Sequence, residues 1–198
     1  MNSLPAATQI VALHDERLAA PGDSKRLDTG VWAAIETNHS QNRMLWEQED
    51  LARRRNVPDG EIAANKRAID TANQKRNDAI EQIDEKLLEA LKNIKPGEGA
   101  RLSSETPGAM IDRLSILALK VHHMRLQTER TDVDARHIAL CLEKLEKLVE
   151  QRSDLAGCLA RLLAEAERGE SYFKVYRQFK MYNDPRLNPA LYGDAKRG

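Results

Sequence analysis

Residues 62–94 decide the fold class, and they read IAANKRAIDTANQKRNDAIEQIDEKLLEALKNI. Steps of four and three residues through this stretch pick out one stripe of a long α-helix: Ile62, Lys66, Ile69, Asn73, Arg76, Ile80, Ile83, Leu87, Ala90 and Ile94. Such a stripe normally faces partner helices and is apolar. Its second half is apolar, but Lys66, Asn73 and Arg76 interrupt its first half. Because an unpaired polar group costs roughly a few kcal/mol when buried, the pattern indicates a polar cavity inside a helical protein.

The preceding helix shows the same interruption. Its stripe carries Trp32, Ile35, His39, Asn42, Trp46, Glu49 and Arg53, and a short turn at residues 56–60 joins the two helices. Folding this hairpin places Glu49 beside Lys66, Asn42 beside Asn73 and His39 beside Arg76. Both stripes are then polar near the turn and apolar at the far end.

The rest of the chain also reads as helix. We expect helices over residues 4–20, 29–55, 61–95, 107–128, 132–168 and 171–182, with Thr106 capping one start and Pro or Gly ending most of them. No stretch has the alternation typical of a strand. The expected fold is all-α, an antiparallel helical bundle of four long helices plus short N- and C-terminal helices. It forms a single domain over residues 1–198, with an irregular tail at 183–198.

Composition narrows the classes of function. The 31 basic and 31 acidic residues give a net charge of zero, which argues against nucleic-acid binding through bulk positive charge. Apolar runs are too short for a membrane span, and the N-terminus lacks a signal-peptide core. Cys141 and Cys158 lie on one predicted helix, roughly 25 Å apart, so they cannot form a disulfide within the chain. The expected location is cytoplasmic.

The helix at 107–128 returns antiparallel and brings Lys120 and His123 to the level of Arg76 and His39, with Asp112, Arg113 and Arg152 nearer the opposite end. This polar band suits a small anionic ligand, with His39 or His123 as a proton carrier. No two histidines lie three or four positions apart, as a helical pair of metal ligands would, so no metal or cofactor is expected. The candidate ligand-binding residues are Asn38, Asn42, Glu49, Asp50, Lys66, Asp70, Asn73, Arg76, Asn77, Asp112, Arg113, Lys120 and Arg152.

Two other readings stay open. In the first, the protein is a structural or adaptor protein whose polar stripe residues set helix register in a homo-oligomer. In the second, a basic and aromatic surface at Arg177, Lys180 and Tyr182 binds nucleic acid, which the neutral net charge argues against.

Several motifs carry a family resemblance. They are Asn38-His39 with Asn42, Leu45-Trp46, Glu49-Asp50, residues 52–54, 66–70, Asn73-Gln74, 76–78, 104–108, 111–117, Lys120, His123-Met124, Gln151-Arg152 and 180–185. With these motifs the chain resembles the bacterial family known as domain of unknown function 4254. The resemblance implies a cytoplasmic helical protein of Gram-negative-type bacteria without an established activity. It also implies a link to glycan or lipopolysaccharide assembly, which would suit a sugar-phosphate ligand.

Residues 78–88 are also similar to the opening helix of helical chorismate mutases, which hold a dianion with Arg, Lys and Gln. The basic residue expected soon after that helix is absent, because Asn93-Ile94-Lys95-Pro96 stands there.

Overall fold

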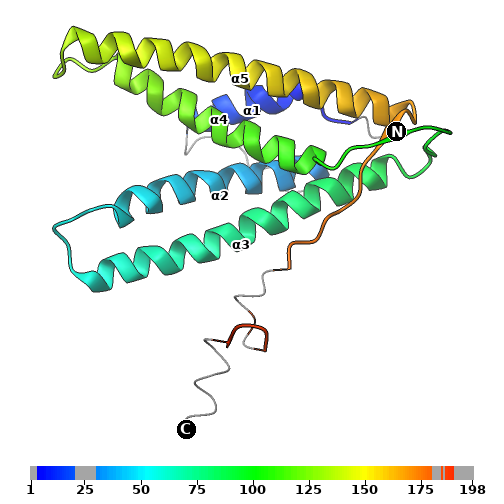
Figure 1. Cartoon of the computed structure of the whole chain (residues 1–198), viewed down its shortest axis with the longest axis horizontal. Helices are drawn as coiled ribbons and strands as arrows, with labels where there is room; N and C mark the ends of the chain where they lie inside the picture. The colour runs from blue at the N-terminus through cyan, green and yellow to red at the C-terminus, as the bar shows by residue number, and fades with distance from the viewer. Residues whose placement is uncertain (1–3, 21–29, 180–183, 185, 190–198) are drawn as a thin grey trace.

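The computed structural model describes residues 4–20, 30–179, 184 and 186–189 (Figure 1). Five α-helices and a two-residue parallel strand pair make up this part of the chain. In chain order they are α1 (Ala7–Ala19), α2 (Gly30–Ala52), α3 (Asp59–Ala90), β1 (Arg101–Leu102), α4 (Pro107–Thr128), α5 (Ala135–Glu167) and β2 (Ser171–Tyr172). The predicted all-α class is confirmed.

Local signals explain where the long helices begin. The Thr106 hydroxyl accepts a hydrogen bond from the Ala109 amide at 3.2 Å, and Pro107 takes the first position of α4, as predicted. The Asp134 carboxylate caps α5 by accepting from the His137 amide at 2.7 Å. Asp59 and Glu61 lie in the first turn of α3, where negative charge complements the helix dipole.

The long helices form two hairpins that diverge toward their turns, α2–α3 and α4–α5 (Figure 1). Helix α4 packs against both α2 and α3, whereas α5 packs against α4, α1 and β2. Within the described residues the backbones of α5 and the α2–α3 hairpin do not contact each other. An antiparallel bundle of all four long helices is therefore not confirmed.

The main apolar core lies where the hairpins converge, away from the α2–α3 turn. Its fully buried side chains come from every helix and include Ile10, Ile35, Ile83, Ile111 and Leu159. A smaller cluster of Leu45, Ile69 and Ala72 lies nearer the turn. The predicted separation of an apolar half and a polar half of the α2–α3 hairpin is thus present.

The predicted helix over residues 171–182 is wrong over the described residues 171–179. Gly169 ends α5 with a φ of +72°, and β2 then pairs with β1. The Ser103 amide donates to the Tyr172 carbonyl at 2.8 Å, and Phe173 is buried. Each strand is only two residues long and pairs with a segment about 70 positions away. Such short strands have no alternation of polar and apolar residues by which the sequence could predict them. Residues 180–182, the turn at 21–22 and most of the predicted tail lie outside the described residues.

None of the helices in the described ranges is long and apolar enough to cross a membrane. Cys141 is buried on α5 and Cys158 is exposed on the same helix, and both are free thiols.

Candidate functional site

A buried carboxylate joins three helices at the polar end of the core. Asp112 of α4 is 3% exposed. Its Oδ1 accepts hydrogen bonds from the Nδ2 atoms of Asn38 and Asn42 on α2, each at 2.9 Å. Arg76 of α3 adds two parallel bonds, Nε to Oδ1 at 2.9 Å and Nη2 to Oδ2 at 2.8 Å. Burial of a carboxylate is costly unless it is paired and hydrogen-bonded, and here both oxygens are satisfied.

A second row of polar groups lies beside Asp112. The Nδ1 atom of His39 and the hydroxyl of Ser115 share a hydrogen bond of 2.8 Å, and Asn42 Nδ2 lies 3.0 Å from the same hydroxyl. The His39 ring stacks on His14 of α1, with centroids 4.6 Å apart and planes at 21°. These contacts extend the polar network from α4 through α2 to α1.

Both stacked imidazoles are neutral at pH 7. Burial lowers the pKa of His39 to about 4, and nearby Arg43 adds to the shift. Burial also lowers the pKa of His14 well below its usual range, with further contributions from His39 and Arg152. The stacked rings of His14 and His39 therefore add no charge to the network around Asp112.

A groove of about 370 Å³ opens above this network, between α2, α3 and α4. The Arg76 side chain is 27% exposed and connects the buried carboxylate to this groove. Its two bonds to Asp112 and a longer one of 3.4 Å to Asn73 Oδ1 use three of the five N–H groups of a guanidinium. The groove is lined by Asn42, Leu45, Trp46, Glu49, Asp50, Arg53, Asn73, Arg76, Ile116 and Leu119.

The structure brings together many of the predicted site residues. Asn38, Asn42, Asn73, Arg76 and Asp112 share hydrogen bonds, and Glu49 and Asp50 line the same groove. Asp112 was expected near the opposite end of the bundle, and that placement is wrong. The irregular connection at residues 96–103 leaves the register of α4 undetermined by sequence.

The predicted Glu49–Lys66 pair is wrong. Glu49 pairs with Arg53 at 3.1 Å, and Lys66 pairs with Asp70 at 3.4 Å on the exposed face of α3. Long charged side chains at the end of a hairpin reach partners one turn along their own helix more readily than a partner across the pair. Lys66 therefore adds no positive charge to this groove.

The remaining candidates lie apart from the network. His123 stacks on Trp46 with ring centroids 4.5 Å apart, and Lys120 lines a different groove with Trp46. Arg152 pairs with Asp15 of α1 at 2.8 Å. The other two are Arg113, which is exposed and pairs with Glu105, and Asn77, which is half-buried on α3.

Sequence reasoning missed two members of the network, Ser115 and His14. Ser115 lies three positions after Asp112, on the same face of α4, so a small hydroxyl on an inner face was the available signal. His14 follows Leu13 directly in a short amphipathic helix whose packing partners are remote in sequence. No comparable signal pointed to its contact with His39.

These features define an all-helical protein in which a carboxylate-centred polar network underlies an open groove. The chain belongs to the family described as "Protein of unknown function (DUF4254)", whose sequence model matches residues 32–175. That segment contains the groove and the network except His14. No curated protein and no solved structure matches the chain, so the similarity to chorismate mutases is unsupported. In the described residues no three His, Cys, Asp or Glu side chains are grouped as a metal site requires.

Proposed function

We propose that the protein binds a small phosphorylated sugar in the groove between α2, α3 and α4. The observation that carries this is the position of Arg76, which Asp112 holds by two parallel hydrogen bonds at the edge of the groove. A guanidinium fixed in this way presents its remaining N–H groups in one orientation, and its planar fork suits a phosphate.

The neighbouring polar groups suit the hydroxyl groups of a sugar. Asn42 uses its Nδ2 in the network, which leaves its Oδ1 to accept from a ligand hydroxyl. Asn73 accepts from Arg76 through Oδ1, which leaves Nδ2 to donate. The carboxylates of Glu49 and Asp50 line the same groove and accept further hydroxyl hydrogen bonds.

The charges around the groove do not by themselves favour binding of a phosphate. Asp112 offsets most of the charge of Arg76, and Glu49 and Asp50 outnumber Arg53. An anion alone therefore gains little, and hydrogen bonds to hydroxyl groups must supply the rest of the affinity. His39 does not line the groove and reaches it only through Ser115 and Asn42, so binding, rather than proton transfer, is the function proposed.

Isothermal titration calorimetry with glucose 1-phosphate, glucose and inorganic phosphate tests this function. We expect glucose 1-phosphate to bind saturably, and more tightly than glucose or inorganic phosphate. Arg76→Ala should weaken it by at least about tenfold, or about 1.4 kcal/mol. Arg113→Ala is the matched control, because Arg113 is exposed and does not line the groove. Equal binding by Arg76→Ala and the parent, or no binding of glucose 1-phosphate by the parent, would reject the proposal.

A structural role is the second candidate, and one observation favours it. Asp112 already accepts four hydrogen bonds from its own chain, so the network can fix the register of α2, α3 and α4 without a ligand. If the protein is an adaptor, sedimentation at micromolar concentration should show an oligomer, and the variants at Arg76 should change stability without affecting any small-molecule binding.

A further inference from the structure

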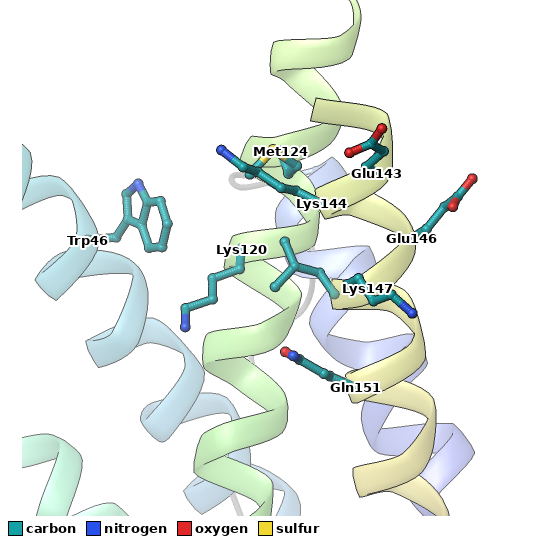
Figure 2. A pocket seen from close by; sticks show the side chains of 9 residues that line it. Trp46, Lys120, Met124, Glu143, Lys144, Glu146, Lys147 and Gln151 are labelled. Carbon is teal, nitrogen blue, oxygen red and sulfur yellow. The ribbon is translucent and has the colours of Figure 1, made fainter. Parts of the chain in front are cut away.

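A second, larger groove lies on the other side of Trp46. It has a volume of about 690 Å³ and separates α2 from the diverging end of the α4–α5 hairpin (Figure 2). Trp46 of α2, Met124 of α4 and Leu148 of α5 supply its apolar lining. This volume lies within the range of about 300–1,000 Å³ that is usual for ligand sites.

The polar side chains that line this groove extend in two directions, toward α2 or away from it. Figure 2 shows Lys120, Lys144 and Gln151 extending toward α2, where Trp46 projects into the same space. Glu146 and Lys147 also line the groove, although in Figure 2 their charged ends extend away from α2.

Lys120 and Lys144, the two lysines that extend toward α2, form no ion pair within the described part of the chain. Lys147 is paired with Glu150 at 2.8 Å, whereas neither Lys120 nor Lys144 has an ion-pair partner among the described residues. Glu143 also lines the groove but forms no ion pair with either lysine. Two ammonium groups without an ion-pair partner among the described residues therefore border the apolar lining, which also carries the carboxylates of Glu143 and Glu146.

The apolar lining combines one fixed wall with adaptable side chains. The indole of Trp46 stacks on the His123 ring with an angle of 5° between the planes, which holds it in place. Met124 is unbranched and polarisable, so it can follow the contour of a flexible chain. A lining of this kind suits an aliphatic chain better than a rigid polar molecule.

We propose that this groove binds a monomeric anionic amphiphile, with an aliphatic chain against Trp46, Met124 and Leu148 and a carboxylate or phosphate head between Lys120 and Lys144. The site is separate from the proposed sugar-phosphate groove, because only Trp46 lines both and Arg76 does not line this one. A concave groove encloses a single chain, whereas a membrane surface requires a protruding apolar face with several basic residues.

Trp46 fluorescence measures binding directly. Trp32→Phe leaves Trp46 as the only tryptophan, since the chain has two. Decanoate, below its critical micelle concentration, is the anionic probe, and 1-decanol is the uncharged probe of equal chain length. We expect a saturable change in emission with decanoate, at least about tenfold tighter than with decanol. Lys120→Met and Lys144→Met, made in this background, should each reduce that preference, and the double variant should abolish it.

Arg161→Met is the matched control, because Arg161 is an exposed cation on the same helix that does not line the groove. It should leave decanoate binding unchanged, and so should Arg76→Ala, which separates this site from the proposed function. Equal affinity for decanoate and decanol in the parent would overturn the proposal, as would a loss of decanoate binding in Arg161→Met equal to that in the lysine variants. Co-sedimentation with phosphatidylglycerol vesicles in the absence of decanoate binding would also overturn it, and would indicate a membrane surface instead.

Discussion

Replacing Asp112 with alanine should be among the most damaging single changes at the polar end of the protein. The substitution leaves Arg76 without its bidentate partner and deprives the amides of Asn38 and Asn42 of an acceptor. Breaking a buried ion pair costs about 3–5 kcal/mol. Arg76 is 27% exposed and can recover some water, so the lower end, ~3 kcal/mol, applies to the pair. The Asn38 amide, which is left without this acceptor, adds ~1 kcal/mol, whereas the Asn42 amide keeps the Ser115 hydroxyl as an acceptor. The expected loss in the free energy of unfolding is therefore about 4 kcal/mol.

Urea unfolding followed by circular dichroism measures this loss. Asp154→Ala is the control, because Asp154 is exposed on α5, and it should change stability by no more than ~0.5 kcal/mol. Removing both partners, in Asp112→Ala with Arg76→Ala, should cost clearly less than the sum of the two single changes. A loss below ~1 kcal/mol for Asp112→Ala, or strictly additive effects in the double variant, would show that the Asp112–Arg76 pair does not stabilise this end of the protein.

Three further predictions concern packing, pH and the C-terminal segment. Gly108→Ala should lower stability by ~1–3 kcal/mol in urea unfolding, because its Cβ would lie 2.5 Å from the Ile80 carbonyl oxygen, whereas Gly157→Ala, with open space around it, should be neutral or stabilising. Burial raises the pKa of Asp84 from 3.8 to about 6, so the contribution of Asp84 to stability grows on acidification from pH 6 to 4. Burial lowers the pKa values of His14 and His39, so the contribution of these two histidines to stability falls between pH 6.5 and 4. Asp84→Asn should therefore steepen the loss of stability between pH 6 and 4, and His14→Phe should flatten it; unchanged slopes would count against both assignments. Arg177→Ala removes ion pairs from the exposed Arg177 to Glu81 and Glu85 and should leave the midpoint of urea unfolding almost unchanged. A clear drop in that midpoint would show that the segment after β2 stabilises α3 more than its contacts indicate.

Periodicity and end signals in the sequence were enough to predict the five helices of the described residues, but they also predicted a helix at 171–182 that is wrong over residues 171–179. The stripe lies on α3 from Ile62 to Ala90, Ile94 follows the end of that helix, and Thr106 and Pro107 begin α4 as predicted. The polar interruptions at Asn42, Asn73 and Arg76 also mark a real feature, because these residues line one groove. Each of these inferences depends on residues within one helix or across one short turn.

Contacts across long or irregular connections were not predictable. The central role of Asp112 depends on the register of α4, which the connection at residues 96–103 sets through β1 pairing with β2. His14 joins the network only because α1 packs against α2, α4 and α5. The Glu49–Lys66 prediction failed for a different reason, since both side chains are exposed enough to choose a neighbour on their own helix. Charge pattern alone could not separate these alternatives.

A nuclear magnetic resonance titration of the ¹⁵N-labelled protein with glucose 1-phosphate tests whether the groove binds a sugar phosphate. If it does, the network centred on Asp112 holds Arg76, Asn42 and Asn73 in position for the ligand. We predict saturable shifts of the Arg76 Nε–H and of the Asn42 and Asn73 side-chain amides, with no shift of the exposed Gln178 amide. Saturable binding that leaves these three groups unperturbed, or no binding at all, would contradict the claim.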